Sequence, residues 1–285
     1  MNRESAAYED AIKRAASIIE YADTLLITAG AGMGVDSGLP DFRGDQGFWR
    51  AYPALKGYSF VDMANPRWFE SDPHRAWGFY GHRLNLYRAT IPHQGFSLLK
   101  NWSDAKQSNS FIFTSNVDGQ FQRAGFNPNQ VWECHGSIHH LQGFTYQGKI
   151  VSAEGIELNI DEEQVRLVGD LPQHPEIQGP VRPNILMFGD GTWNDQRCEQ
   201  QEQRFDDWLD RVQEQRIAVI EMGAGTALPS VRRFGENIVM RLNSALLIRI
   251  NLREPQFDRF SSEQGVSIGL GALEALTHIN EHMNS

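Results

Sequence analysis

A short apolar run leads directly into a glycine-rich turn at residues 24–34, Thr-Leu-Leu-Ile-Thr-Ala-Gly-Ala-Gly-Met-Gly. We interpret residues 25–28 as a buried strand. Glycines let backbone N–H groups approach an anion, and the N-terminus of a following helix adds a positive dipole. Val35 stands where the dinucleotide-binding fingerprint needs its third glycine, and no Gly-Lys-Ser/Thr follows as in a P-loop. The run alone therefore fits nucleotide binding and an ordinary strand–helix turn equally well.

Outward from this turn, apolar runs alternate with helical stretches along the chain. Apolar residues recur at helical spacing from Ala11 to Ala22, and we expect this helix to end near Asp23. Further buried strands are expected at residues 111–113, 185–187, 217–220 and 245–248, and further helices at residues 204–212, 231–242 and 272–279. This alternation predicts an α/β fold with a Rossmann-like parallel sheet and helices on both faces.

Two regions interrupt the alternation. Residues 50–85 are rich in aromatic side chains and helix-like, with Asp72-Pro73 as a helix start, and residues 138–182 hold short alternating segments around Gly148 and Gly155 that predict a β-hairpin. We expect these regions to form a small second domain. The sheet domain is then expected to comprise residues 1–49, 86–137 and 183–285. Since ligands bind at the carboxyl ends of the strands in open α/β folds, a cleft between the two domains is the expected site.

The composition excludes several classes of protein. With 285 residues, 40% of them apolar and 22% charged, the chain is not disordered as a whole. A net charge of −10 argues against a nucleic-acid partner, and no apolar run approaches the roughly 18 residues of a membrane helix. The charged first residues lack the apolar core of a signal peptide, which predicts a cytoplasmic location. Two cysteines, Cys134 and Cys198, rule out a disulfide framework and a four-cysteine zinc site.

The segment after the glycine run narrows the possibilities. Residues 37–44, Ser-Gly-Leu-Pro-Asp-Phe-Arg-Gly, carry a turn proline followed by an acid, an aromatic and an arginine. This segment is either a surface turn in which Asp41 and Arg43 pair, or a loop that folds over a bound ligand and presents Phe42 to it.

With this segment the chain resembles the sirtuin family of NAD-dependent protein deacylases. The family's first motif reads Gly-Ala-Gly-x-Ser and then Ser-Gly-Ile-Pro-Asp-Phe-Arg, from which Gly34 and Leu39 depart. Its later motifs match, in order, Thr114-Ser115-Asn116-Val117-Asp118, Ala124-Gly125, His135-Gly136-Ser137, Arg182-Pro183, Phe188-Gly189-Asp190, Gly225-Thr226-Ala227 and Ile250-Asn251. Each motif is short, but their order along residues 10–280 is specific.

The resemblance implies NAD as the cofactor and an acyl-lysine protein or peptide as the substrate. Within it, His135 is the general base for a ribose hydroxyl, Asp118 holds the carboxamide and Asn116 orients ribose and water. Histidine suits the role of base because its unperturbed pKa of about 6.5 is close to working pH. Without the resemblance, His135 also fits a turn, Asp118 a helix cap and Asn251 a turn residue after a strand. The other cofactor contacts that it implies are Gly30, Ala31, Gly32, Gly34, Asp41, Phe42, Arg43, Ser115, Gly223, Gly225, Thr226 and Asn251.

The chain departs from the family at several positions. Most sirtuins hold zinc through two Cys-x-x-Cys pairs, but residues 143–146 are Gly-Phe-Thr-Tyr and the second pair is missing too. We therefore predict no metal, although Cys134, His139 and His140 are close in sequence, and we expect a hairpin at residues 143–168 to hold the small domain by apolar packing. Ser115 replaces a glutamine of the family, and Gln120-Phe121 replaces its Leu-His.

The substrate side is predicted from two further pairs of residues. An extended peptide is expected to pair through its main chain between Phe188-Gly189 and the loop after Gly223, which would favour deacylation. Tyr80 and Arg83 are three apart, so they share one face of a predicted helix. They resemble the pair that binds the acyl carboxylate in sirtuins that remove succinyl and malonyl groups, although such a pair is also common on amphipathic helices.

These observations predict an NAD-dependent lysine deacylase that cleaves nicotinamide from NAD and forms O-acyl-ADP-ribose. An NAD hydrolase or an ADP-ribosyltransferase is the first alternative, because both share nicotinamide cleavage and differ only in the second nucleophile. A non-catalytic NAD sensor is the alternative from another class.

Overall fold

The computed structural model describes residues 3–41, 44–108, 110–144, 148–257, 261 and 263–285. Its larger layer is a six-stranded sheet in the order β11-β10-β9-β1-β2-β3, and every strand pair in it is parallel. The strands are β1 (Thr24–Ala29), β2 (Phe111–Thr114), β3 (Val131–Glu133), β9 (Ile217–Met222), β10 (Ala245–Ile250) and β11 (Gly265–Ile268). The predicted parallel sheet is confirmed.

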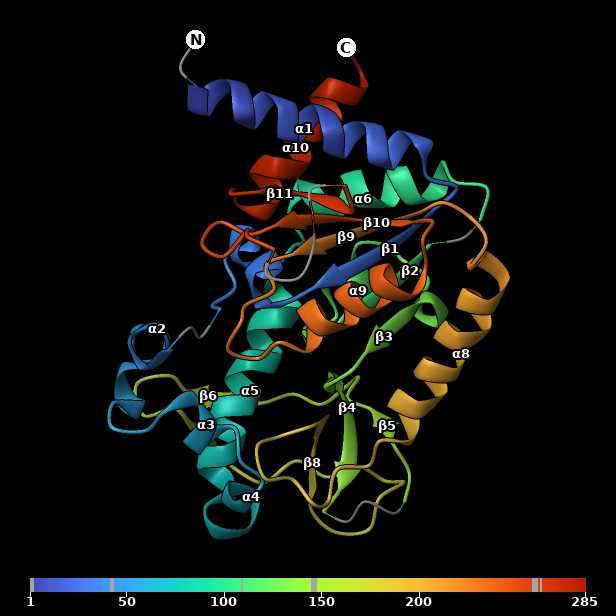
Figure 1. The fold of residues 1–285 in the computed structure, drawn as a ribbon. Helices are drawn as coiled ribbons and strands as arrows, with labels where there is room; N and C mark the ends of the chain where they lie inside the picture. Colours follow the sequence, from blue (N-terminus) through green and yellow to red (C-terminus); the bar gives the residue numbers. More distant parts are fainter. Residues whose placement is uncertain (1–2, 42–43, 109, 145–147, 258–260, 262) are drawn as a thin grey trace.

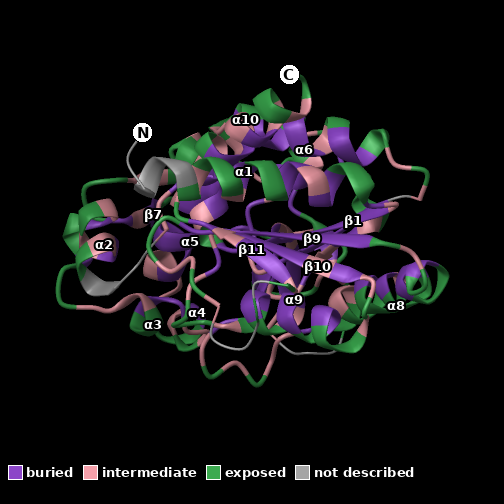
Figure 2. Ribbon diagram, turned by 45° about the horizontal axis from the view of Figure 1, so that its top comes forward, coloured by how far each residue is buried: buried purple, intermediate pink, exposed green. Residues whose placement is uncertain are grey.

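Helices cover both faces of this sheet, as predicted (Figures 1 and 2). One face carries α1 (Arg3–Tyr21), α6 (Gln94–Asp104) and α10 (Ala272–Met283), and the other carries α8 (Gln196–Val212) and α9 (Ser230–Arg241). The apolar stripe of α1 includes Ile12 and Ile19, which are buried against the sheet, while Phe205 and Trp208 of α8 fill the opposite face. Because helices cover both faces, β1 and β9 are buried at every residue.

A second, smaller layer lies beyond the carboxyl ends of the strands (Figure 1). It has its own buried apolar cluster, separate from the clusters that flank the sheet. Its helices are α2 (Gly44–Ala51), α3 (Phe60–Met63), α4 (Arg67–Ser71) and α5 (Pro73–Ala89), and its strands are β4 (Gly136–Gly143), β5 (Val151–Ser152), β6 (Asn159–Asp161), β7 (Arg166–Val168) and β8 (Val181–Ile185). The short helix α7 (Gln120–Arg123) follows β2. The domain boundaries given above stay a prediction.

Asp72 starts α5, as predicted. Its side chain accepts a hydrogen bond from the Arg75 amide, and Pro73 occupies the first helical turn, where its missing N–H costs nothing. The cap also ties α5 to the β6–β7 hairpin, because both Asp72 carboxylate oxygens pair with Arg166 at 2.9 and 3.0 Å. The helix that carries Tyr80 and Arg83 is therefore fixed at its start.

Two predicted elements are wrong in detail. The strand expected at residues 185–187 is β8, which ends at Ile185 and belongs to an antiparallel sheet of order β5-β4-β8. The Leu186 amide still donates to the His135 carbonyl at 3.0 Å, next to the last paired residues Gly136 and Ile185, and the chain beyond it forms a loop. The predicted hairpin exists as β6–β7, but it turns at residues 162–165 and not at Gly148 or Gly155.

No helix in the described part of the chain is both long enough and apolar enough to cross a bilayer.

Candidate functional site

A cavity of about 1040 Å³ is lined by residues that follow the carboxyl ends of β1, β2, β3 and β9 and by residues of the smaller layer. Pockets for single small ligands occupy roughly 300–1,000 Å³, so this one has room for a large ligand. The predicted site residues that line it are Gly30, Ala31, Gly34, Asp41, Tyr80, Arg83, Ser115, Asn116, Asp118, His135, Phe188, Gly189, Gly223, Gly225 and Thr226. Phe42 and Arg43 lie outside the described residues. The chain therefore gathers residues from most of its length around one cavity.

Gly32 is not among the residues that line the cavity, and its predicted contact with the cofactor stays a prediction. Its amide donates to the Gly223 carbonyl at 3.0 Å, and the Gly30 amide donates to Met222 at 3.0 Å. A Cβ atom on Gly32 would stand 2.7 Å from the Gly223 Cα atom. The glycine is thus required by the close approach of two loops. These two amides serve loop contacts, and the predicted approach of the glycine run to an anion stays a prediction.

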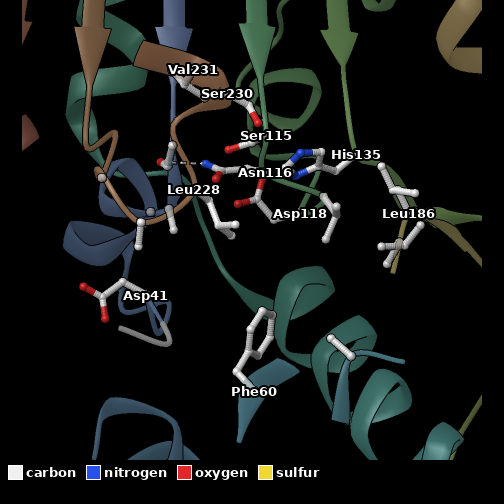
Figure 3. A pocket seen from close by; sticks show the side chains of 18 of the residues that line it. Asp41, Phe60, Ser115, Asn116, Asp118, His135, Leu186, Leu228, Ser230 and Val231 are labelled. Carbon is white, nitrogen blue, oxygen red and sulfur yellow. Dashed lines mark hydrogen bonds between the residues drawn. The ribbon is translucent and has the colours of Figure 1, made fainter. Parts of the chain in front are cut away.

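Asn116 follows β2 and is fixed there by Thr114 of β2 and by Gly30, which follows β1. Its amide donates to Thr114 Oγ1 at 3.0 Å, and its Nδ2 donates to the Gly30 carbonyl at 3.0 Å (Figure 3). No described residue donates to its Oδ1. The side chain therefore has one orientation, in which its amide nitrogen bonds the Gly30 carbonyl and its oxygen is available to a ligand.

Asp118 is a buried carboxylate in the wall of the cavity. Its pKa is raised from 3.8 to about 6, mainly by burial and with a contribution from the Glu133 carboxylate, while the hydrogen bond from the Gln120 amide and the charge of Arg83 oppose the shift. Its Oδ1 accepts a hydrogen bond from the Gln120 amide at 2.9 Å, and its carbonyl lies 2.8 Å from His139 Nε2. A buried carboxylate in this position is a strong acceptor for a ligand N–H group.

His135 lies beside Asn116 and Asp118, between β3 and β4 (Figure 3). Burial lowers the pKa of its imidazole, and a hydrogen bond to the Ser115 backbone opposes the shift. The ring is therefore neutral at pH 7 and able to accept a proton. Its backbone carbonyl accepts from the Leu186 amide, which places the loop after β8 next to the ring.

Asn251 supports the cavity wall and does not line it, although it was predicted as a cofactor contact. Its Nδ2 donates to the Ala224 carbonyl at 2.7 Å, and its Oδ1 accepts from the amides of Arg253 and Glu254 at 3.0 and 2.9 Å. The buried Arg232 of α9 donates to the same Ala224 carbonyl at 3.0 Å. Together these side chains hold the loop that carries Gly223, Gly225 and Thr226.

Glu254 is a cavity residue that the sequence analysis missed. Its carboxylate accepts from the amide and the hydroxyl of Thr226 at 3.2 and 2.5 Å. Its position three residues after the predicted site residue Asn251 could have indicated a role in the site, whereas nothing in the sequence pattern marks Arg232 as a site residue. Other lining residues that were not predicted include Phe60, Tyr87, Leu228 and Ser230.

Tyr80 and Arg83 lie on one face of α5, as predicted, and both are buried while lining the cavity. Phe60 approaches this end of the cavity from α3 (Figure 3). Phe188 donates its amide to the Ala64 carbonyl at 2.8 Å, and the exposed Gly189 lies next to it. Below this loop, Arg182 and Asp190 form an ion pair of 2.5 Å that is shielded from water.

In the described part of the chain, no group of three or more His, Cys, Asp and Glu side chains is placed to hold a metal ion. His139 instead bonds the Asp118 carbonyl, and Cys134 lies near Cys198, whose thiol bonds the Cys134 carbonyl.

The comparisons with known proteins agree with this arrangement. Residues 30–251 match the family model described as the Sir2 family. An NAD-dependent protein deacetylase of Saccharolobus solfataricus is 33% identical over 189 residues, which cover 64% of this chain and 66% of that protein. An NAD-dependent protein deacylase of Candida albicans is 33% identical over 143 residues, or 50% of this chain and 42% of that protein. The chain thus spans less than two thirds of the length of these curated relatives.

Solved structures share the fold. A Sir2 homologue in complex with NAD has a TM-score of 0.66 at 22% identity, covering 97% of this chain and 93% of that one. A Sir2 protein bound to an acetylated peptide has a TM-score of 0.64 at 18% identity, covering 94% and 96%. At such identities the likeness establishes the fold alone, whereas the family model covers most of the chain. The ordered motifs, the parallel sheet and that match together place this chain in the Sir2 family.

Proposed function

We propose that this protein is an NAD-dependent protein-lysine deacylase. The observation that carries the proposal is the convergence of Asn116, Asp118 and His135 at the carboxyl ends of two adjacent strands, inside one large cavity (Figure 3). The names of the curated relatives, NAD-dependent protein deacylase and deacetylase, support it.

The residues present fit NAD. When bound, NAD supplies a bond between ribose and nicotinamide whose cleavage builds positive charge on the sugar. Asp118 accepts a hydrogen bond from the carboxamide, and its burial excludes water from that contact. Asn116, held by Gly30, presents its oxygen to ribose or to a bound water. His135 takes the proton of a ribose hydroxyl, for which its neutral state is required.

Hydrolysis of NAD and ADP-ribosyl transfer are the alternatives, because the same three residues serve both. The mouth of the cavity favours deacylation. Leu186 and Leu228 are large apolar side chains that line it and remain exposed, and the exposed Gly189 offers backbone to an extended peptide. A site used only for water needs none of these features.

We also propose a preference for acidic acyl groups. The guanidinium of Arg83 is buried at the cavity wall together with the Tyr80 hydroxyl group, and in a site of low dielectric it attracts a carboxylate strongly. A succinyl or malonyl group carries such a carboxylate, whereas an acetyl group does not. A cytoplasmic location also stays a proposal.

The test is incubation with NAD, with and without acetyl-lysine and succinyl-lysine peptides, followed by mass spectrometry. We expect O-acyl-ADP-ribose only when peptide is present, faster turnover of the succinyl peptide, and no product from a His135→Ala protein. ADP-ribose formed equally without peptide would support NAD hydrolase, and an ADP-ribose adduct on protein would support transfer. Binding of NAD without any product would support a sensor.

A further inference from the structure

We propose that Tyr87 is a positioning residue that orients Arg83 for the carboxylate of an acyl group. This inference rests on the acidic-acyl preference proposed above and assigns the side chain that creates it. Tyr87 lies four residues after Arg83, which places both on the same face of α5. The two side chains line the same cavity, where they are 5% and 6% exposed.

The phenol fixes one edge of the guanidinium. Arg83 Nε donates to Tyr87 Oη at 3.0 Å, and both partners are buried. A guanidinium binds a carboxylate in a bidentate manner through two neighbouring nitrogens in its plane. Because Tyr87 engages Nε, a bidentate carboxylate approaches this arginine through Nη1 and Nη2. The hydrogen bond therefore selects which edge of Arg83 meets the ligand.

The surrounding rings hold the guanidinium in place but do not set its rotation. Its central carbon lies 5.3 Å from the ring centre of Phe79, 5.6 Å from that of Tyr80 and 6.0 Å from that of Phe60. Such cation–π contacts are attractive but tolerate rotation of the guanidinium in its own plane. The directional bond to Tyr87 removes that freedom, so less ordering is needed when a ligand binds.

Tyr87 also joins the two ends of the cavity. Its carbonyl accepts from Gln120 Nε2 at 3.5 Å, and Gln120 donates its amide to Asp118. The Asp118 carboxylate raises the pKa of the Tyr87 hydroxyl, whereas the Arg83 guanidinium lowers it. The phenol thus interacts electrostatically with both the cation assigned to the acyl group and the carboxylate assigned to the carboxamide.

A Tyr87→Phe protein tests the inference, because the change removes only the hydroxyl. We expect the ratio of kcat/KM for succinyl-lysine over acetyl-lysine peptide to fall about tenfold, the loss expected for one hydrogen bond to a charged group. The lower ratio should result from a higher KM for the succinyl peptide, with kcat for this peptide and the rate of deacetylation unchanged. Calorimetric binding of both peptides in the presence of ADP-ribose gives the same comparison without turnover.

Two further variants make the result decisive. In an Arg83→Met protein the ratio should fall, and adding Tyr87→Phe should change it no further, because the phenol acts only through the arginine. Tyr8→Phe is the control: it removes a buried hydroxyl from a tyrosine of α1 that packs edge-on against His278 and does not line the cavity. This variant should leave the ratio unchanged.

The possible failures are distinguishable. If Arg83→Met leaves the ratio unchanged in turnover and in binding, the acidic-acyl preference is wrong and the inference falls with it. If Arg83→Met lowers the ratio but Tyr87→Phe does not, only the positioning role is wrong. The same conclusion holds if Tyr87→Phe lowers kcat/KM for both peptides equally. If no peptide is turned over, the deacylase proposal fails, and the binding ratio still decides the role of Tyr87.

Discussion

At the scale of single residues, Asp118 shows a conflict between stability and function. Burial raises its pKa to about 6, so its ionised form is less favourable in the folded protein than in the unfolded chain. The same burial excludes water from the contact proposed for the carboxamide of NAD. We interpret this carboxylate as a group that the fold tolerates at a cost in stability because the site requires it.

Asp118→Asn should therefore stabilise the protein and stop NAD cleavage. Because the pKa of Asp118 is higher in the folded protein, its carboxyl group costs no stability below the unfolded pKa of 3.8. The cost in the free energy of unfolding grows as the pH rises through the folded pKa of about 6. The shift corresponds to at most about 3 kcal/mol at pH 8 and roughly half of that at pH 5. Asparagine can still accept from the Gln120 amide, so the substitution removes the charge and keeps this hydrogen bond. Urea unfolding at both pH values measures the resulting gain in the free energy of unfolding.

The exposed Asp170, for which we expect no such gain, provides the control Asp170→Asn. A gain for Asp118→Asn that is the same at pH 5 and pH 8 would contradict the electrostatic explanation. A loss of stability at both pH values would show that the carboxylate is favourable in the fold.

At the scale of elements, the sequence predicted the strands and helices of the sheet better than the loops of the site. Apolar runs and helical periodicity follow from burial on one or two faces, so β1 and α1 were readable from local pattern. Gly32 was predicted as a ligand contact, but it is required by contact with Gly223, which is distant in sequence. Local sequence cannot distinguish these reasons, because both need a residue without a side chain.

Helix α9 and the end of β10 together hold the loop at residues 224–226, which gives a second prediction. Arg232→Met should raise KM for NAD about tenfold with little change in kcat, because the Ala224 carbonyl keeps Asn251 but loses its other donor. Steady-state kinetics with varied NAD measures the split between the two constants. Arg241→Met, on the same helix but exposed, should leave both unchanged. An equal fall of kcat in the Arg232 variant would mean that the arginine acts on the reaction step.

At the scale of the whole molecule, the cavity lies between the apolar clusters that flank the sheet and the apolar cluster of the smaller layer. The cluster of the smaller layer is formed by residues far apart in the sequence, such as Phe79 and Leu167. The sequence indicated that these regions are distinct, but not how they interlock, since that depends on contacts between side chains and backbone across long separations. The antiparallel pairing of β8 with β4 was hidden for the same reason.

Gly78→Ala tests how the smaller layer is held together. A Cβ atom there would stand 2.0 Å from the Val165 carbonyl oxygen, so α5 and the β6–β7 hairpin would have to separate. We expect a loss of about 1–3 kcal/mol in the free energy of unfolding, the usual cost of overpacking. Because α5 carries Tyr80 and Arg83, the same shift should lower the preference for succinyl over acetyl peptides. Gly191→Ala, where a Cβ atom meets nothing within 4 Å, should change neither quantity. A destabilised Gly78 variant with unaltered acyl preference would show that the acyl end of the cavity is fixed from the sheet side, through Asp118 and Gln120, and not by the hairpin.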